Sequence, residues 1–283
     1  MRIGAHVSTA GGLSTAFDRA QAIGAEAIQI FASSPRAWAF KGPSDKEVAL
    51  FKEKSARTGI SPVFLHGSYL VNLGGNQDLL QKCTESLTSN LTVAAQIGAN
   101  GVIFHSGSHK GVGFDAVFDQ VVGVLSKVIS QTPESAQLII ENCAGSGDQI
   151  GDSFKEVGRI LHALKSPRVK VCLDTQHAFA AGYNVRDRDG LSAAMGEFDR
   201  EIGLGNLSAV HANDSKGDLS CGVDRHENIG DGFIGYEGFA MLMGHPAFKE
   251  VPFLLEVPGI EDNGPDRENV DRLKAIRKTL ELE

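Results

Sequence analysis

The feature that most constrains this sequence is a regular alternation of short apolar runs with longer amphipathic segments. The short runs are rich in β-branched residues and have the length of buried parallel strands, and the segments between them have helical periodicity. Eight expected strands cover Arg2–Val7, Ala25–Phe31, Pro62–His66, Gly101–His105, Gln137–Glu141, Val169–Asp174, Leu207–His211 and Pro252–Glu256. Eight expected helices lie near residues 13–23, 45–58, 77–97, 115–130, 153–164, 189–202, 236–244 and 266–281.

This alternation predicts a (β/α)₈ barrel, because each strand is followed by a helix that can cover it. The chain has 283 residues, and such a barrel fills roughly 250 residues as one domain. No proline-rich or serine-rich linker interrupts the series, so we expect a single domain over residues 1–283 with its active-site loops at the carboxyl ends of the strands. A doubly wound parallel sheet is the alternative fold.

The composition limits the partners and the compartment. With 27 Lys and Arg against 35 Asp and Glu, the net charge is −8, so binding to a nucleic acid would need a local positive centre. The four cysteines lack C-x-x-C spacing, which favours a reducing compartment. Because neither a signal peptide nor a long apolar span is present, we expect a soluble, cytoplasmic monomer without a membrane or an obligate protein partner.

Six successive expected strands end in a side chain that can bind a metal. In a barrel the carboxyl ends of the strands converge on one face, so residues far apart in sequence would share one pocket. Burying several ionisable groups together without a cation costs several kcal/mol per unpaired charge. A metal cluster is therefore a better interpretation than a structural polar network. The six residues are His66, His105, Glu141, Asp174, His211 and Glu256.

Two short motifs add three more candidate ligands. His177 follows Asp174 by three residues just past a strand, where a turn can present both side chains to the same pocket. Asp224 and His226 are two residues apart and share a face if the segment is extended. They lie in the longest gap between strand ends, where a loop over Asp218–Gly232 can fold over the mouth of the barrel.

Five imidazoles and four carboxylates exceed the needs of one ion. With three or four protein ligands per catalytic metal and one bridging carboxylate, nine residues fill three sites. Imidazole-rich sites favour zinc, with manganese or iron as alternatives. Three divalent ions outweigh four carboxylates, and the resulting positive centre favours an anionic substrate such as a phosphate ester.

With these residues in place, the chain resembles the endonuclease IV family of apurinic/apyrimidinic endonucleases. The resemblance runs the whole length and is carried by several segments. They include Gly4–Ser8, Ser34–Trp38, His66–Leu70, His105–His109, Glu141–Gly145, Leu173–His177, Phe179–Tyr183, His211–Lys216, Val223–His226, Asn228–Gly232 and Leu255–Pro258. The sequence departs from the usual family pattern at Ala37, Ser68, Ser106 and Gln176, none of which is a ligand position.

The resemblance implies three zinc ions and assigns their ligands. One ion would bind His66, His105 and Glu141, a second Glu141, Asp174, His211 and Glu256, and a third His177, Asp224 and His226. It also implies that Arg36, Tyr69 and Leu70 contact DNA and fill the stack when an abasic nucleotide is extruded.

The implied activity is hydrolysis of duplex DNA on the 5′ side of an abasic site, as in base excision repair. The products would be a 3′-hydroxyl and a 5′-deoxyribose phosphate, and blocked 3′ ends would be further substrates. A metal-activated hydroxide would attack, and the catalytic carboxylates Glu141 and Glu256 would bind metal and orient it. A metal-dependent sugar isomerase or epimerase and a non-enzymatic damaged-DNA or metal-storage protein are the alternatives.

Overall fold

The computed structural model describes residues 1–281 and contains a closed barrel of eight parallel strands. The strands follow the order β1-β10-β7-β6-β5-β4-β3-β2 around the barrel, so each neighbours the next strand of the series in the chain. The barrel strands are β1 (Ile3–His6), β2 (Ala27–Phe31), β3 (Val63–His66), β4 (Gly101–Phe104), β5 (Gln137–Glu141), β6 (Val169–Asp174), β7 (Leu207–His211) and β10 (Phe253–Leu255). The (β/α)₈ prediction is confirmed.

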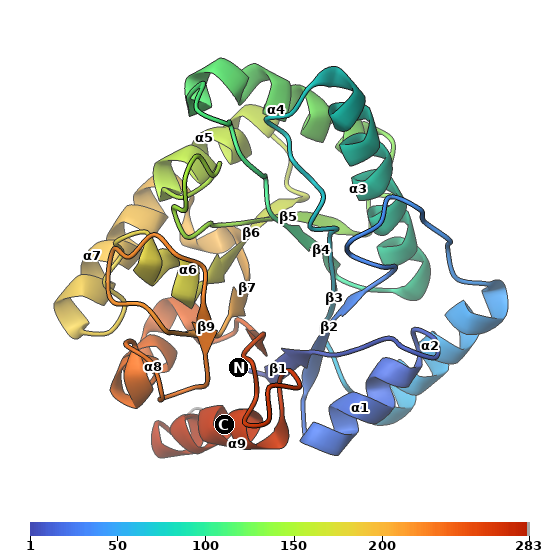
Figure 1. Ribbon diagram of the computed structural model, residues 1–283. Helices are drawn as coiled ribbons and strands as arrows, with labels where there is room; N and C mark the ends of the chain where they lie inside the picture. The colour runs from blue at the N-terminus through green and yellow to red at the C-terminus, as the bar shows by residue number, and fades with distance from the viewer. Residues whose placement is uncertain (282–283) are drawn as a thin grey trace.

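Helices surround the barrel and cover every side of it (Figure 1). The outer helices are α1 (Thr15–Ile23), α2 (Asp45–Thr58), α3 (Gln77–Ile97), α4 (Phe114–Ser130), α5 (Phe154–Leu164), α7 (Arg188–Glu201), α8 (Gly235–Gly244) and α9 (Arg267–Thr279). None of the helices within residues 1–281 combines the length and apolar character that crossing a membrane requires.

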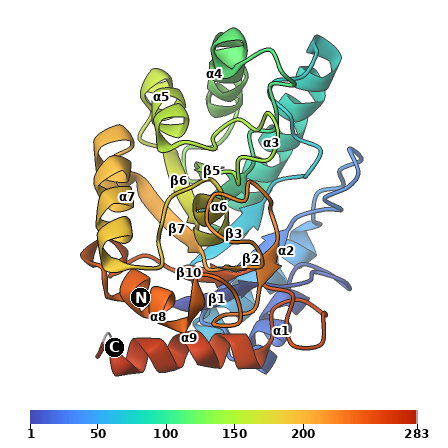
Figure 2. The same ribbon diagram turned by 60° about the vertical axis from the view of Figure 1, so that its left-hand side comes forward.

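Short elements that the sequence pattern did not predict lie between these units. They are the helix α6 (Thr175–Ala180), the two-stranded antiparallel pair of β8 (Asp214–Ser215) and β9 (His226–Glu227), and the 3₁₀ turns η1 (Leu204–Asn206) and η2 (Pro246–Phe248). Each is too short for hydrophobic periodicity to detect. The loop between β8 and β9 lies over α6 at one end of the barrel (Figure 2), as we expected for the segment around Asp218–Gly232.

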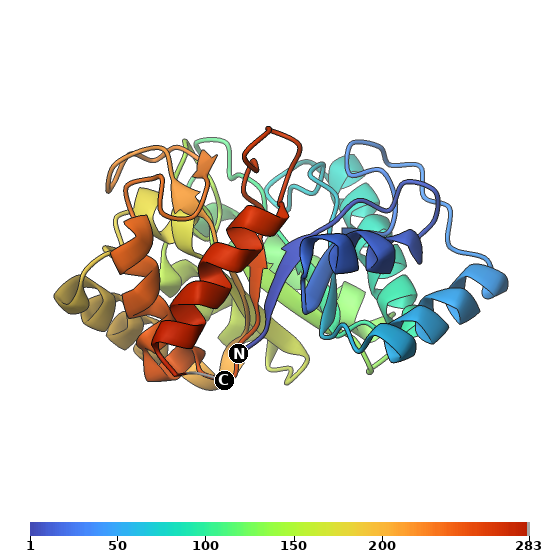
Figure 3. The same cartoon turned by 90° about the horizontal axis from the view of Figure 1, so that it is seen from below.

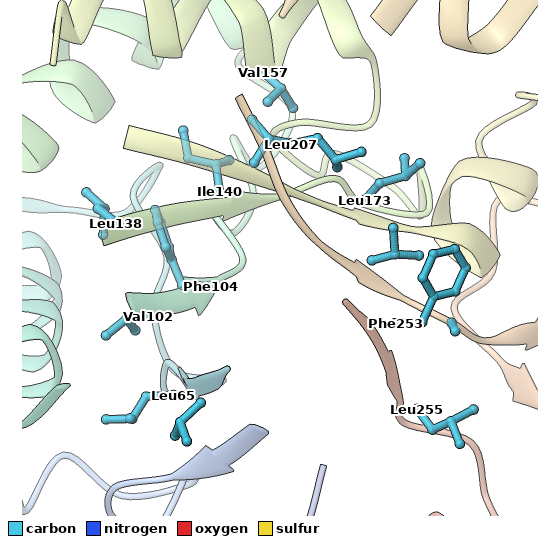
Figure 4. Close-up of a cluster of buried hydrophobic side chains, with 14 of the residues drawn as sticks. Leu65, Val102, Phe104, Leu138, Ile140, Val157, Leu173, Leu207, Phe253 and Leu255 are labelled. Atoms are coloured by element: carbon cyan, nitrogen blue, oxygen red, sulfur yellow. The ribbon is translucent and has the colours of Figure 1, made fainter. Parts of the chain in front are cut away.

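Side chains alternate between the two faces of each barrel strand. One set points outward against the helices and forms the large core that Figure 4 shows in part, including Leu138 and Ile140 of β5. The other set fills the inside of the barrel as a compact buried layer. That inner layer consists of Ala27, Phe64, Ile103, Ile139, Cys172, Ala209 and Leu254.

The barrel is closed by β1 and β10, where Ile3 pairs with Phe253. Glu26, which lies just before β2, accepts two hydrogen bonds from Arg277 of α9 at 2.7 and 2.9 Å and a third from the backbone N–H of Ile3. The first and last helical units are thereby joined at the end of the barrel where both termini lie. Figure 3 shows the long loops at the opposite end.

The bounds of several elements differ slightly from prediction. His105 and Glu256 each lie one residue past the strand that we expected them to end, so both belong to the loops. The spacing of Ser44 and Glu47 is that of a capping box, and Ser44 caps α2 through the backbone N–H of Glu47, but the Glu47 carboxylate does not complete the box. It accepts instead from the backbone N–H of Ser14 at 2.7 Å, because α1 packs beside α2.

Candidate metal centre

The candidate ligands form a polar layer directly above the apolar layer inside the barrel. Successive residues of a strand point to opposite faces, so a residue two positions past an inward side chain also points inward. Ile139 lies in the inner layer and Glu141 follows it by two positions, and the same spacing relates Phe64 to His66 and Ala209 to His211. Strand periodicity therefore places the predicted strand-end residues in one pocket.

Glu141 lies at the centre of this pocket and is fully buried. Its Oε2 atom lies 3.3 Å from His66 Nε2 and 3.4 Å from His105 Nε2. Its Oε1 atom lies 2.9 Å from His211 Nδ1 and 3.3 Å from His177 Nδ1. Oε2 thus faces His66 and His105 and Oε1 faces His211, so the two oxygens face different imidazoles, as a bridging carboxylate needs.

A second group of donors shares Glu141. The ligand atoms of Glu141, Asp174, His211 and Glu256 all lie within 4.8 Å of one another, as do those of His66, His105 and Glu141. His211 Nδ1 lies 3.3 Å from Glu256 Oε2 and 3.8 Å from Asp174 Oδ2. Both groups match the sets that the family resemblance implies.

The ligand atoms of the third group within 4.8 Å of one another belong to Asp174, to His177 of α6 and to His226 of β9, and Asp224 approaches this group from the loop before β9. Asp174 caps α6 by accepting a hydrogen bond from the backbone N–H of His177, which turns the His177 ring into the pocket. Asp224 Oδ1 lies 3.4 Å from His177 Nε2 and 3.3 Å from His226 Nε2, although about half of the Asp224 side chain is exposed. Asp174 also comes within 3.8 Å of His226 Nε2, so Asp174 lies between the second and third groups.

One nitrogen of each imidazole is anchored outside the pocket and the other faces the carboxylates. Metal-binding histidines in proteins are oriented in this way by a partner on the second nitrogen. The anchoring contacts join His66 Nδ1 to Gly67 O (2.8 Å), His105 Nδ1 to Cys143 Sγ (3.6 Å), His177 Nδ1 to Asn142 O (3.0 Å), His211 Nε2 to Gln29 Oε1 (2.8 Å) and His226 Nδ1 to Glu256 O (3.3 Å). The inward nitrogens of His177 and His226 are buried without a hydrogen-bond partner. Two such nitrogens beside a carboxylate fit a cation.

The electrostatics of the pocket also favour cations. Burial raises the pKa of Glu141, but His105, His211 and His177 lower it to well below its usual value. Burial lowers the pKa of His177, yet Asp174, Asp224 and Glu141 together raise it well above its usual value. Within residues 1–281, the ion pairs of Glu141, Asp174, Asp224 and Glu256 are all made with imidazoles rather than with lysine or arginine. The buried carboxylates thus face imidazole nitrogens, and divalent cations could bind between them.

Three amide side chains that the sequence analysis missed hold the ligands in place. Gln29 donates to Glu256 Oε1 at 2.6 Å besides its contact with His211. Asn142 accepts from the backbone N–H of Asp174, and Asn213 donates to Asp174 Oδ2 at 2.7 Å. Gln29 follows the inward residue Ala27 by two positions, so the same count that finds Glu141 would have found it. Asn142 and Asn213 follow Glu141 and His211 closely in sequence.

The proposed DNA-contacting residues lie on two adjoining loops beside the pocket. The backbone N–H of Tyr69 donates to Pro35 O at 3.0 Å, so the loop of Tyr69 and Leu70 is joined to that of Arg36. Tyr69 is 55% exposed, Arg36 is exposed and Leu70 is half-buried. Trp38, by contrast, packs against the hydrophobic core, which agrees with a structural role.

A groove of about 980 Å³ runs along these loops to the candidate ligands. Its lining includes Ser34, Tyr69, His226, Glu256 and Asn263. An extended polymer lying in the groove could therefore reach Glu256 and His226 from outside.

Three further residues at or just past the ends of the barrel strands, His6, His109 and Cys143, differ from one another in their contacts. His6 Nδ1 lies 3.0 Å from Gln29 Nε2 and 3.5 Å from Glu256 Oε1, so it borders the second group. His109 Nδ1 accepts from the backbone N–H of Gly113 and belongs to a turn. Burial raises the pKa of the Cys143 thiol to about 12, which keeps it protonated.

A closed (β/α)₈ barrel with eight converging imidazole and carboxylate donors defines the class of this protein. It is a TIM barrel with a candidate multinuclear metal centre at the carboxyl ends of its strands.

Comparison with known proteins gives the family. The family model described as "Xylose isomerase-like TIM barrel" matches residues 17–279. A protein from Halothermothrix orenii named "Probable endonuclease 4" is 40% identical over 276 residues, covering 97% of this chain and 99% of the relative. The crystal structure of endonuclease IV from Thermus thermophilus superposes with a TM-score of 0.85 at 35% identity and covers all of both chains. The chain belongs to the endonuclease IV family within the xylose isomerase-like TIM barrels.

A D-tagatose 3-epimerase-like protein is also similar in structure, with a TM-score of 0.76 over 100% of this chain and 98% of the other. The sequence identity is 18%, so this likeness concerns the fold alone.

Proposed function

We propose that this protein is a DNA-repair hydrolase that cuts the phosphodiester bond on the 5′ side of an abasic site in duplex DNA and also trims blocked 3′ ends. The observation that carries the proposal is Glu141, whose two buried oxygens face different imidazoles, Oε2 toward His66 and His105 and Oε1 toward His211. Such a centre suits an anionic phosphodiester, and the groove leading to Glu256 suits a polymer. Membership of the endonuclease IV family supports both points.

The three donor groups would hold three divalent cations, and the five imidazoles favour zinc over magnesium or calcium, with manganese or iron as alternatives. Bound cations would supply a water of lowered pKa and positive charge for the phosphate oxygens. Glu141 would join the first two groups, and His177, Asp224 and His226 would form the third.

The protein side chains would orient the reactants rather than react with them. Glu256 is 16% exposed and its carboxylate is ionised, so it can orient the attacking water from the side of the groove. Gln29 keeps Glu256 in place through its 2.6 Å hydrogen bond. Burial raises the pKa of the thiols of Cys143 and Cys172 to about 12 and about 11, which removes both as nucleophiles.

Lys216 is also unsuited to covalent chemistry. Its side chain is 48% exposed and lies 3.8 Å from Glu227, whereas a Schiff-base lysine needs a desolvated pocket to lower its pKa. Hydrolysis rather than β-elimination is therefore the expected reaction.

The loops beside the groove would replace the missing base. Extruding an abasic nucleotide costs a few kcal/mol of unstacking. Arg36, Tyr69 and Leu70 offer a cation, an aromatic ring and an aliphatic side chain, a mixture that suits insertion into a duplex.

A substrate panel tests the proposal. Zinc-loaded protein would be incubated with an abasic duplex, with the matched intact duplex, and with a set of aldoses and ketoses. We expect cleavage of the abasic duplex alone, and its loss in Glu256→Gln. Interconversion of a sugar without cleavage would instead establish an isomerase, and binding without either reaction would establish a damaged-DNA-binding protein.

A further inference from the structure

We propose that Asp214 is a positioning residue that holds the loop carrying Asp224 and His226 against His177, an inference that rests on the proposed function of the third ligand group. Asp214 is fully buried in β8 and lies outside the three groups of candidate ligands. Its role follows from what its carboxylate binds.

The carboxylate of Asp214 accepts hydrogen bonds from four backbone N–H groups of one returning segment. The donors are Gly230 (2.9 Å), Gly232 (3.1 Å), Ile234 (2.9 Å) and Gly235 (3.2 Å). An asparagine at this position would offer one oxygen and direct an N–H₂ group at buried donors. A buried donor without a partner is costly, so the segment follows this conformation because Asp214 is there.

The returning segment packs closely against Asp214. A Cβ atom on Gly232 would lie 2.5 Å from Asp214 Oδ1 and 2.5 Å from Ser215 O. Gly230 and Gly235 have φ values of 89° and 73°, which side-chain-bearing residues rarely adopt. The glycines thus permit the close approach that the four hydrogen bonds require.

The same β8 residues fix the ligand-bearing strand. Asp214 pairs with Glu227 and Ser215 pairs with His226, so the position of β8 determines that of the His226 ring. The backbone N–H of Phe233 donates to Ser215 O at 2.8 Å and returns the chain to β8. β8 is therefore bonded both to β9, which carries His226, and to the returning segment at Phe233.

Helix α6 holds the other end of the loop. Gln176, which precedes His177, donates from Nε2 to Val223 O at 2.9 Å, and Val223 precedes Asp224. The backbone N–H of Gly222 donates to Ala180 O at the end of α6 at 2.9 Å. Gln176 is one of the positions at which this chain departs from the family pattern. Its amide joins the segments that carry His177 and Asp224 to each other.

The test compares Asp214→Asn, Gly232→Ala and Gln176→Met with a matched control, Gly158→Ala. A Cβ atom on Gly158 would lie 2.1 Å from Glu201 O, so the control strains the contact of α5 with α7 and leaves the loop intact. Each protein would be titrated with zinc against a chelator. Amide hydrogen exchange over residues 216–235 would be measured on the metal-free protein.

We expect the three loop variants to bind the third ion at least about tenfold more weakly than wild type while keeping the first two. Amide hydrogen exchange over residues 216–235 should be at least about tenfold faster in metal-free Asp214→Asn than in wild type. Gly158→Ala should keep the wild-type affinity for the third ion and the wild-type exchange rate.

Wild-type third-ion affinity and loop protection in folded Asp214→Asn would overturn the inference. If that variant does not fold, the same two measurements on Gly232→Ala and Gln176→Met decide. A wild-type chain that binds no third ion and cuts no abasic duplex would overturn the proposed function instead. The exchange measurement does not depend on metal and separates the two failures.

Discussion

Replacing Glu141 should remove more metal than replacing any other candidate ligand. Its Oε2 faces His66 and His105 at 3.3 and 3.4 Å, and its Oε1 faces His211 at 2.9 Å. Glu141→Gln keeps the volume of the side chain but replaces one oxygen by an N–H₂ group, and the charge that both sites share is lost.

The size of the effect follows from that sharing. Changes outside the ligand set commonly lower metal affinity about 10–100-fold, so losing a direct ligand should cost each of two sites at least this much. The combined loss is then about 100- to 10,000-fold, or about 3–6 kcal/mol at 1.4 kcal/mol per tenfold. His226→Ala should weaken one ion only, because His226 belongs to the third group.

The assay is a chelator competition followed by metal counting by mass spectrometry. Glu156→Gln is the matched control, because Glu156 belongs to none of the donor groups. Its Oε2 atom accepts a hydrogen bond from the backbone N–H of Gly151, which lies on a loop near the pocket. We expect three ions in the control and fewer than two tightly bound ions in Glu141→Gln. A Glu141→Gln protein that retains three tightly bound ions would refute the bridging role.

Two further predictions concern DNA binding and stability. Tyr69→Ala and Arg36→Ala should keep all three metals but weaken cleavage of an abasic duplex far more than removal of a 3′-terminal phosphate, because the latter needs no nucleotide extrusion. Equal losses on both substrates would contradict insertion of these side chains into the duplex. Burial raises the pKa of Glu26, but hydrogen bonds from Arg277 and Ile3 outweigh burial and lower the pKa from 4.5 to about 2. The contribution of the ionised Glu26 to the free energy of unfolding is therefore complete above pH 4.5 and is lost as the pH falls to about 2. After allowance for solvent screening, Glu26→Gln should lower the free energy of unfolding by about 1–2 kcal/mol at pH 7 and by almost nothing near pH 2. Urea denaturation at the two pH values measures the difference, and a loss that does not change with pH would contradict the argument.

The sequence was sufficient for the fold and for the ligands that strand periodicity places. Once eight strands were assigned, His66, Glu141 and His211 had to point into the barrel, because each follows an inward residue by two positions. Gln29 obeys the same rule, but an amide is not a typical metal ligand and its role depends on contacts with Glu256 and His211.

The loop geometry could not be predicted in this way. Helix α6 has six residues, so it carries no periodic signal. The position of Asp224 beside His177 depends on hydrogen bonds from Gln176 and to Asp214. Such contacts exist only after the chain has folded, and single-residue patterns do not encode them.

The most direct test of the central claim is the chemistry of the ends left at an abasic site. Zinc-loaded protein would be incubated with a labelled duplex that contains one abasic site, and the products would be offered to a DNA polymerase and separately treated with borohydride during the reaction. We predict a cut on the 5′ side with a 3′-hydroxyl that the polymerase extends at once, and no covalent adduct at Lys216. An unsaturated sugar on the 3′ end, a trapped adduct or an uncut duplex would contradict the account.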